Sequence, residues 1–165
     1  MRHLVIALAI GWLAGCQGDA PGTQQALSGA PALDELDDAS RQAALSSPVP
    51  VLLLPEGWGP RSIVTSGRGF YAVSARNGEL AVSIHASDVV HHAGDGMQAP
   101  EPREHTVRGR PARVLVNDGI RSVTWDEGRT SYVVEVECYR ALEDPRCTEA
   151  AFVVALAESL VEVAR

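Results

Sequence analysis

Lysine is absent from this chain of 165 residues: all 14 basic residues are arginine, and 21 acidic residues outnumber them. The resulting formal net charge of −7 is spread along the chain, which argues against a nucleic-acid partner because polyanion binding needs clustered positive charge. Composition is otherwise ordinary for a globular protein, with 45% hydrophobic and 21% charged residues. We therefore expect a globular domain that does not bind nucleic acid.

Patterns that mark common catalytic centres are also missing. The serines lie in no GxSxG element, and Gly67-Arg68-Gly69 and Gly94-Asp95-Gly96 lack the strand–loop–helix setting of phosphate-binding loops. Glu135 and Glu137 share one face of a predicted strand, as paired glycosidase carboxylates could, but a charged exposed strand face explains them as well. We expect no enzymatic activity and no cofactor.

Cysteine is scarce, with three residues in all: Cys16, Cys138 and Cys147. Eight residues separate the last two, and no histidine flanks them, so neither zinc-ribbon nor CxxC redox spacing is present. In an exported protein these two cysteines have one possible pairing with each other. We expect a disulfide worth about 2.5 to 3 kcal/mol by the loop-entropy model.

No apolar run is long enough to span a bilayer, which needs about 20 residues. The N-terminus instead has the parts of an export signal: Arg2, the apolar stretch Leu4–Trp12, and Leu13-Ala14-Gly15-Cys16. These last four residues resemble the lipobox of bacterial lipoproteins, in which the chain is cut before the cysteine and the thiol is lipidated. The alternative is an ordinary secretory signal with a chance cysteine.

The lipobox divides the chain into residues 1–15, a signal peptide; 16–31, a flexible Gly-, Ala- and Gln-rich tether; and 32–165, a single domain. Loss of Arg2 with the signal takes the formal net charge from −7 to −8. Lipid such as palmitate on Cys16 would anchor the domain stably in a membrane. In lipoproteins of diderm bacteria, aspartate after the cysteine marks inner-membrane retention, so Gln17 favours the outer membrane, facing the periplasm.

Within the domain, spacing predicts a short amphipathic helix over 32–46 and an edge strand or extended segment over 49–54, flanked by prolines. Two hairpins follow, 70–76 with 79–87 across Asn77-Gly78 and 113–117 with 120–126 across Asp118-Gly119.

A long strand, 129–139, comes after these hairpins. Leu80, Val82 and Ile84 alternate with Ala81, Ser83 and His85, and the long strand alternates similarly, which indicates one buried and one wet face. Trp58 and Trp125 are expected in the core or at its edge.

Helical spacing returns at Phe152, Leu156, Leu160 and Val163, with Asp144 or Thr148 as the cap at its start. The disulfide would then join the last strand to this helix. The sequence predicts an α+β fold: an antiparallel β-meander with a C-terminal helix packed on one face and a short N-terminal helix.

Several elements together resemble a group of uncharacterised proteobacterial exported proteins. The resemblance covers about residues 48–163. The elements are the proline-flanked run 48–55, Phe70-Tyr71, Trp125, Tyr132, Glu137-Cys138, Asp144-Pro145-Arg146-Cys147 and the stretch 156–160. The "EC…DPRC" element is the most specific. The order of elements is also similar to that of PsbP-like lipoproteins. Neither resemblance supplies a catalytic residue.

The region most suited to partner binding is a long loop followed by arginines. The loop carries His91, His92 and Met97, and the basic residues that follow include Arg103, Arg108 and Arg110. A long loop is more often functional or disordered than idle, and arginine often dominates interface energetics. A solvated loop and hairpin would look the same.

The same region also contains potential metal ligands. The potential ligands are His85, Asp88, His91, His92, Asp95, Met97 and His105. His91 and His92 are adjacent, and on a strand adjacent side chains point to opposite faces, so we expect no metal site.

The sequence thus favours a membrane-anchored envelope lipoprotein that binds a protein or wall component without catalysing a reaction. The second hypothesis is an inhibitor or immunity lipoprotein directed against a periplasmic hydrolase. A protruding rigid loop would favour this hypothesis. An enzyme acting on envelope glycan or lipid is the third.

Overall fold

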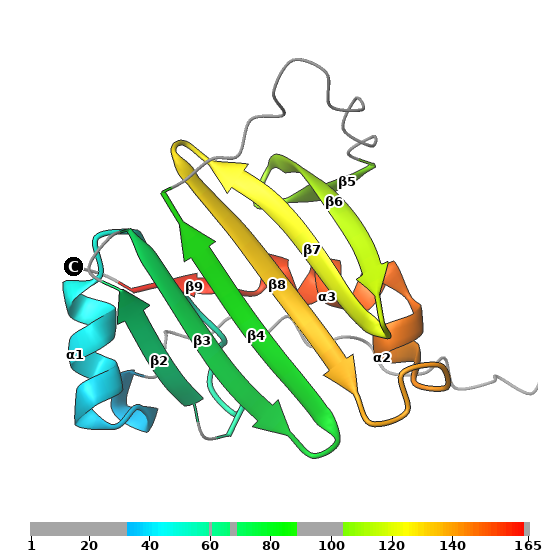
Figure 1. Ribbon diagram of the computed structural model, residues 1–165, viewed down its shortest axis with the longest axis horizontal. Helices are drawn as coiled ribbons and strands as arrows, with labels where there is room; N and C mark the ends of the chain where they lie inside the picture. The colour runs from blue at the N-terminus through cyan, green and yellow to red at the C-terminus, as the bar shows by residue number, and fades with distance from the viewer. Residues whose placement is uncertain (1–32, 60, 67–68, 89–103, 164–165) are drawn as a thin grey trace, which may run out of the picture.

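The computed structural model describes residues 33–59, 61–66, 69–88 and 104–163. The predicted α+β class is confirmed (Figure 1). The helical elements are η1 (Leu33–Glu35), α1 (Asp38–Ser46), α2 (Pro145–Thr148) and α3 (Ala150–Glu158). The strands are β1 (Leu52–Leu53), β2 (Arg61–Ser66), β3 (Phe70–Asn77), β4 (Leu80–Ser87), β5 (His105–Val107), β6 (Arg110–Asn117), β7 (Ile120–Glu127), β8 (Thr130–Cys138) and β9 (Val161–Glu162). None of the described helices is long and apolar enough to cross a membrane.

Seven antiparallel strands form the main sheet in the order β2-β3-β4-β8-β7-β6-β5. It consists of two meanders, β2-β3-β4 and β5-β6-β7-β8, and the last strand of the second lies against the last strand of the first (Figure 1). In this pairing Ile84 opposes Val134, so two strands far apart in sequence form the centre of the sheet. The predicted meander is therefore interrupted once, between β4 and β5.

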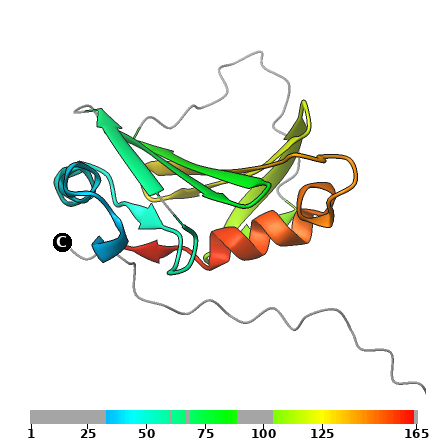
Figure 2. The same ribbon diagram turned by 90° about the horizontal axis from the view of Figure 1, so that it is seen from below.

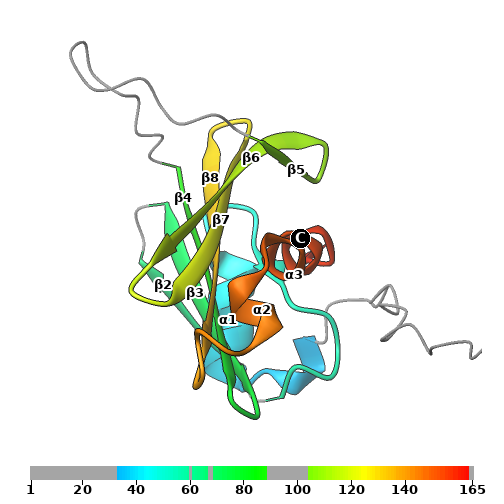
Figure 3. The same cartoon turned by 90° about the vertical axis from the view of Figure 1, so that its right-hand side faces the viewer.

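Alternation along the strands separates a covered face from an open one. On β4 and β8 every second residue is buried, including Ile84 and Val134, which are 0% exposed. The covered face packs against α3 and the small β1–β9 sheet, as Figures 2 and 3 show. Trp58 and Trp125 are both buried, as predicted.

One predicted turn is confirmed and another is displaced by one residue. Asn117 pairs with Ile120, and the two residues between them, Asp118 and Gly119, both have positive φ, as a type I′ turn requires. In the β3–β4 hairpin Asn77 pairs with Leu80, so the turn residues are Gly78 and Glu79 rather than Asn77-Gly78. Gly78 alone has positive φ there, which matches a type II′ turn with glycine first.

The C-terminal segment is shorter in helix than predicted. Asp144 caps α2 by accepting a hydrogen bond from the Arg146 backbone N–H at 2.9 Å, as the Asp-Pro pair indicated. Helix α3, however, ends at Glu158, and Val161–Glu162 forms β9 against β1. The helical spacing of Leu160 and Val163 therefore reflects burial on the covered face and not a continued helix.

The proline-flanked segment predicted as an edge strand or extended segment forms β1, which pairs with β9 in a two-stranded sheet. It is buried beneath the main sheet, where two tyrosines hold it. The Tyr71 hydroxyl accepts a hydrogen bond from the Leu52 N–H at 2.9 Å, and the Tyr132 hydroxyl donates to the Pro50 carbonyl at 3.1 Å. Burial raises the pKa of Tyr132 to about 12 and raises the pKa of Tyr71 further, so both phenols remain protonated.

Helix α1 lies along the β2 edge of the sheet. It begins at Asp37, whose carboxylate accepts a hydrogen bond from the Ser40 N–H at 2.7 Å. The buried Ser40 hydroxyl in turn accepts a hydrogen bond from the Ile63 N–H of β2 at 3.2 Å. An outward-facing backbone donor of an edge strand is thereby satisfied within the molecule.

Candidate functional site: the open face of the sheet

The face of the sheet opposite α3 carries short polar side chains. Register places four cross-strand rows on this face, in which Ser87 meets Ser131, His85 meets Val133, Ser83 meets Glu135 and Ala81 meets Glu137. The neighbouring strands continue these rows with Phe70, Ala72, Ser74 and Arg76 on β3, Ile120, Ser122, Thr124 and Asp126 on β7, and Pro111, Arg113, Leu115 and Asn117 on β6. Among the described elements no helix covers this face (Figures 2 and 3).

A histidine–glutamate pair occupies the centre of the open face. Nε2 of His85 lies 3.3 Å from Oε2 of Glu135, across the β4–β8 boundary that joins the two meanders. Both side chains are about two-fifths exposed, at 38% and 40%. The Phe70 ring lies beside His85 with ring centroids 6.4 Å apart. Sequence reasoning identified the face of each strand but not this pair, because the strands are nearly fifty residues apart.

This arrangement is suited to binding rather than to a small enclosed reaction centre. Hydroxyl groups accept and donate hydrogen bonds, His85 and Glu135 add a donor and an acceptor, and Phe70 adds an apolar ring. These groups lie on a broad surface instead of converging in a cavity, whereas sites for small molecules are usually concave. The open face is therefore a broad polar surface and not a cavity.

A small hollow of about 200 Å³ lies at one end of the open face. It is lined by Arg76, Glu79, Glu137 and Tyr139, among others, where the β3–β4 hairpin meets the end of β8. This volume is below the roughly 300 to 1,000 Å³ of typical ligand pockets. The hollow is better described as a border between the open face and the loop that follows β8.

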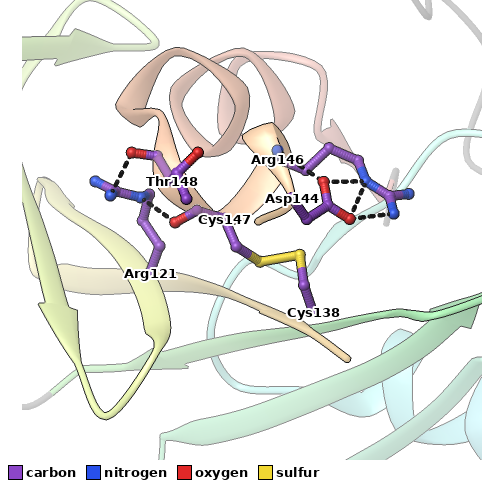
Figure 4. The surroundings of a disulfide bond; sticks show 6 residues. All are labelled: Arg121, Cys138, Asp144, Arg146, Cys147 and Thr148. Carbon is purple, nitrogen blue, oxygen red and sulfur yellow. Dashed lines mark hydrogen bonds and ion pairs between the residues drawn. A yellow bond between two sulfur atoms is a disulfide. The ribbon is translucent and has the colours of Figure 1, made fainter. Parts of the chain in front are cut away.

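The predicted disulfide is confirmed at this same end (Figure 4). Cys138 at the end of β8 is bonded to Cys147 in α2, with the two Cα atoms 6.1 Å apart. Arg121 of β7 donates to the carbonyl of Cys147 at 2.8 Å and to that of Thr148 at 2.7 Å. These contacts attach α2 to the sheet by a covalent bond and by a guanidinium at the helix C-terminus, where positive charge is favourable.

An ion pair reinforces the same turn. Nε of Arg146 lies 2.9 Å from Oδ1 of Asp144, and its terminal nitrogen contacts the second carboxylate oxygen (Figure 4). These hydrogen bonds lower the pKa of Asp144 and raise that of Arg146. The "DPRC" element thus supplies a helix cap, a first-turn proline, a bidentate cation and a disulfide partner within four residues.

The predicted partner residues are only partly covered by the structure. Cys16, His91, His92, Met97 and Arg103 lie outside the described residues. Their roles stay predictions.

Arg108 is described, and its contacts lie within the molecule. Its Nε donates to Oε1 of Glu127 at 2.7 Å, and Nη1 donates to the Leu160 carbonyl at 3.0 Å. Its backbone N–H donates to Glu158 at 2.8 Å, and the indole N–H of Trp125 donates to the same Glu127 oxygen at 2.8 Å. Arg108 therefore joins the β5–β6 turn to the end of α3, which favours a structural role over its predicted partner contact. The sequence indicated only that Arg108 belongs to a basic cluster. Its contact with Leu160 left no local pattern, because the two residues are over fifty positions apart.

Arg110 and the described histidines have other positions. Arg110 is exposed at the start of β6. His85 and His105 lie on β4 and β5 with three strands between them, which corresponds to about 19 Å across a sheet. These two histidines cannot share a metal ion, and the described residues contain no group of three or more potential metal-binding side chains.

Comparison with known proteins reveals no relative. The chain matches no protein-family model, no curated protein and no solved structure. The functional argument accordingly depends on the residues themselves.

Proposed function

We propose that this chain is a lipid-anchored envelope protein that binds an envelope protein or a wall component through the open face of its sheet, without catalysing a reaction. The observation that carries the binding part is the broad polar face around His85 and Glu135, which the described helices leave uncovered. The proposed lipid anchoring depends on the Leu13-Ala14-Gly15-Cys16 element, which directly follows a short apolar run.

The anchoring is tested first and separately. The precursor is expressed with a palmitate analogue in a bacterial host, and Cys16→Ser is compared with the unchanged chain. We expect label and cleavage before residue 16 in the unchanged chain and neither in the variant. Equal labelling of the two would contradict the lipoprotein assignment.

The binding face is tested by a bulky charged substitution at its centre. Ser83→Arg places a long side chain between Ser74 and Glu135, and the nearby carboxylate can accept the new charge without loss of folding. Gln42→Arg makes the same charge change on the exposed side of α1 and serves as the control. Arg110→Glu tests the predicted arginine surface in the same assay.

The assay measures co-sedimentation with purified wall sacculi and cross-linking to outer-membrane proteins, in separate arms. We expect Ser83→Arg to reduce binding about tenfold or more in one arm while Gln42→Arg retains it. The responding arm identifies the partner class. If Ser83→Arg retained binding and Arg110→Glu lost it, the binding surface would lie instead around Arg110, at the start of β6.

A second candidate, an inhibitor or immunity lipoprotein, is favoured by one observation. The Cys138–Cys147 bond closes a loop that presents Tyr139 and Leu142 at 81% and 89% exposure. A rigid loop with exposed apolar side chains suits insertion into an enzyme cleft. This candidate would be favoured if the unchanged protein and Ser83→Arg both inhibited a periplasmic hydrolase and Leu142→Ser did not.

A further inference from the structure

Large apolar side chains are exposed mainly at one end of the molecule. Among the described residues five are exposed, and four of them lie on the β6–β7 hairpin and the loop after β8: Leu115 at 39%, Val116 at 56%, Tyr139 at 81% and Leu142 at 89%. The fifth, Leu45 at 44%, is on α1. Leu115 belongs to the open face, and Val116, the next residue of β6, belongs to the opposite face, so the four residues border both sides of this end. We name these four the apolar tip.

The hairpin and the loop that form the apolar tip are neighbours. A Cβ atom at Gly119, in the turn between β6 and β7, would lie 3.0 Å from Cβ of Ala141 in the loop. On the other side of the loop, the Tyr139 N–H donates to the Glu79 carbonyl of the β3–β4 turn at 3.0 Å. The loop is therefore seated between two hairpin turns at this end of the sheet.

The loop is held in place while its apolar side chains point outward. The disulfide closes it, and the Arg140 carbonyl accepts hydrogen bonds from the N–H groups of Glu143 and Asp144, each at 3.0 Å. Arg140 and Glu143 also form an ion pair at 3.2 Å. The exposure of Tyr139 and Leu142 is thus a property of an ordered turn. Exposed apolar patches usually mark an interaction site.

The described chain begins at the same end of the sheet. The start of α1 lies against β2 through the Ser40–Ile63 hydrogen bond. Strand β2 begins at Arg61, opposite Ala75 and thus near the β3–β4 turn. Figure 1 shows η1 and the loop after β8 at the lower end of the strands. Sixteen residues separate Cys16 from Leu33, a reach of at most about 60 Å.

We propose that the apolar tip rests on the bilayer that carries the lipid anchor, with Tyr139 at the headgroup level and Leu142 inserted beside it. This inference depends on the proposed lipidation of Cys16. Tyrosine is favoured at membrane interfaces, and a second contact adds to the anchor's own affinity.

The surrounding charges define which lipid surface fits. Glu79 and Glu137 lie beside Tyr139 together with Arg76, Asp118 is in the hairpin turn, and Glu143 is paired with Arg140. Carboxylates thus outnumber arginines around the apolar tip, and the whole chain is acidic. Anionic headgroups would repel these carboxylates. The tip therefore fits a zwitterionic surface such as phosphatidylethanolamine. In this orientation the open face is presented sideways, where a partner can reach it.

The test places a fluorescent reporter in the tip. Full-length lipidated protein carrying Leu142→Trp is reconstituted into phosphatidylethanolamine–phosphatidylcholine vesicles that contain brominated phosphatidylcholine, which quenches tryptophan on contact. Leu45→Trp, the exposed leucine of α1, is the matched control. The native Trp58 and Trp125 are buried and give a common background.

We expect a blue shift and at least about twofold stronger quenching for Leu142→Trp than for Leu45→Trp. Quenching should decrease when phosphatidylglycerol replaces part of the phosphatidylcholine. Equal quenching of the two variants in labelled, lipidated protein would overturn the inference. The inference would also be overturned if the Leu142→Trp fluorescence shifted to the blue on addition of an envelope hydrolase and not on addition of vesicles. That result would favour the inhibitor hypothesis.

The two proposals fail in different ways. Absence of palmitate label in the unchanged chain would reject the anchor itself, and the vesicle experiment would then have no lipidated protein to use. Normal labelling with unquenched Leu142→Trp would reject only the membrane contact.

Discussion

The two faces of the main sheet differ although the same strands form both. On β8, Val134 is fully buried, whereas Val133, one residue earlier, is only partly buried beside His85. Apolar packing determines the residues of the covered face, because each one contributes to the core. The open face carries serine, threonine, histidine and glutamate, whose partly exposed side chains lie outside the core. The comparison separates residues that maintain the fold from those that can carry function.

The sharpest test of this difference is a matched pair on β8. Val134→Ala removes two methyl groups from the core and should lower the free energy of unfolding by about 2 kcal/mol. Val133→Ala makes the same chemical change on the open face and should cost less than about 0.7 kcal/mol. Urea denaturation measures both values. Similar losses for the two variants would show that the open face is covered in solution.

A second comparison concerns two arginines, Arg108 in the β5–β6 turn and Arg110 directly after it. Arg108→Glu breaks the contacts to Glu127 and Leu160 and should cost about 1 to 2 kcal/mol, because the partly exposed ion pair is screened by solvent. Arg110→Glu should change stability by less than about 0.5 kcal/mol. Thermal unfolding distinguishes them. An unchanged melting temperature in Arg108→Glu would return Arg108 to the candidate partner surface.

The smallest expected effect is at the cap of α2, which joins the covered layer to the sheet. Asp144→Ala should cost about 1 kcal/mol near neutral pH, through loss of the cap. The pKa of Asp144 is lowered in the folded state, so its ionic contribution is present above the ordinary pKa of about 3.9 and is lost as the pH falls through the lower folded value.

Asp144→Asn serves as the control because asparagine can also cap a helix but carries no charge. It should lose only the ion pair with Arg146, and the gap between this variant and the unchanged protein should close in acid. Chemical denaturation across pH 3 to 7 measures the gap; a gap that widened in acid would contradict the assignment.

Local patterns predicted much of this fold. Alternation on β4 and β8 indicated the buried face, Asp118-Gly119 marked its turn, and the spacing of Cys138 and Cys147 indicated the disulfide. In each case the determining interactions lie within about ten residues of sequence. Strand β2 was not predicted, because its two apolar residues, Ile63 and Val64, are adjacent and give no alternation in the sequence.

Long-range pairing accounts for what could not be predicted. Neither the β4–β8 contact that joins His85 to Glu135 nor the β1–β9 pairing leaves a local pattern. In the second case the periodicity of Leu160 and Val163 matched a helix, but pairing with β1 determined the conformation. The apolar tip escaped notice for a similar reason, since exposure depends on which turns meet.

The serine that satisfies a backbone donor of β2 also affects how copies of this protein behave toward one another. An edge strand with unpaired donors can recruit a strand from a second molecule and begin a growing sheet. The Ser40 hydroxyl occupies one such donor, at Ile63, and α1 stands where a second strand would have to lie. The opposite edge is a strand of only three residues, His105–Val107, which gives an added strand little length for pairing. Molecules crowded together on one surface would thus tend to remain separate, and each open face would remain accessible.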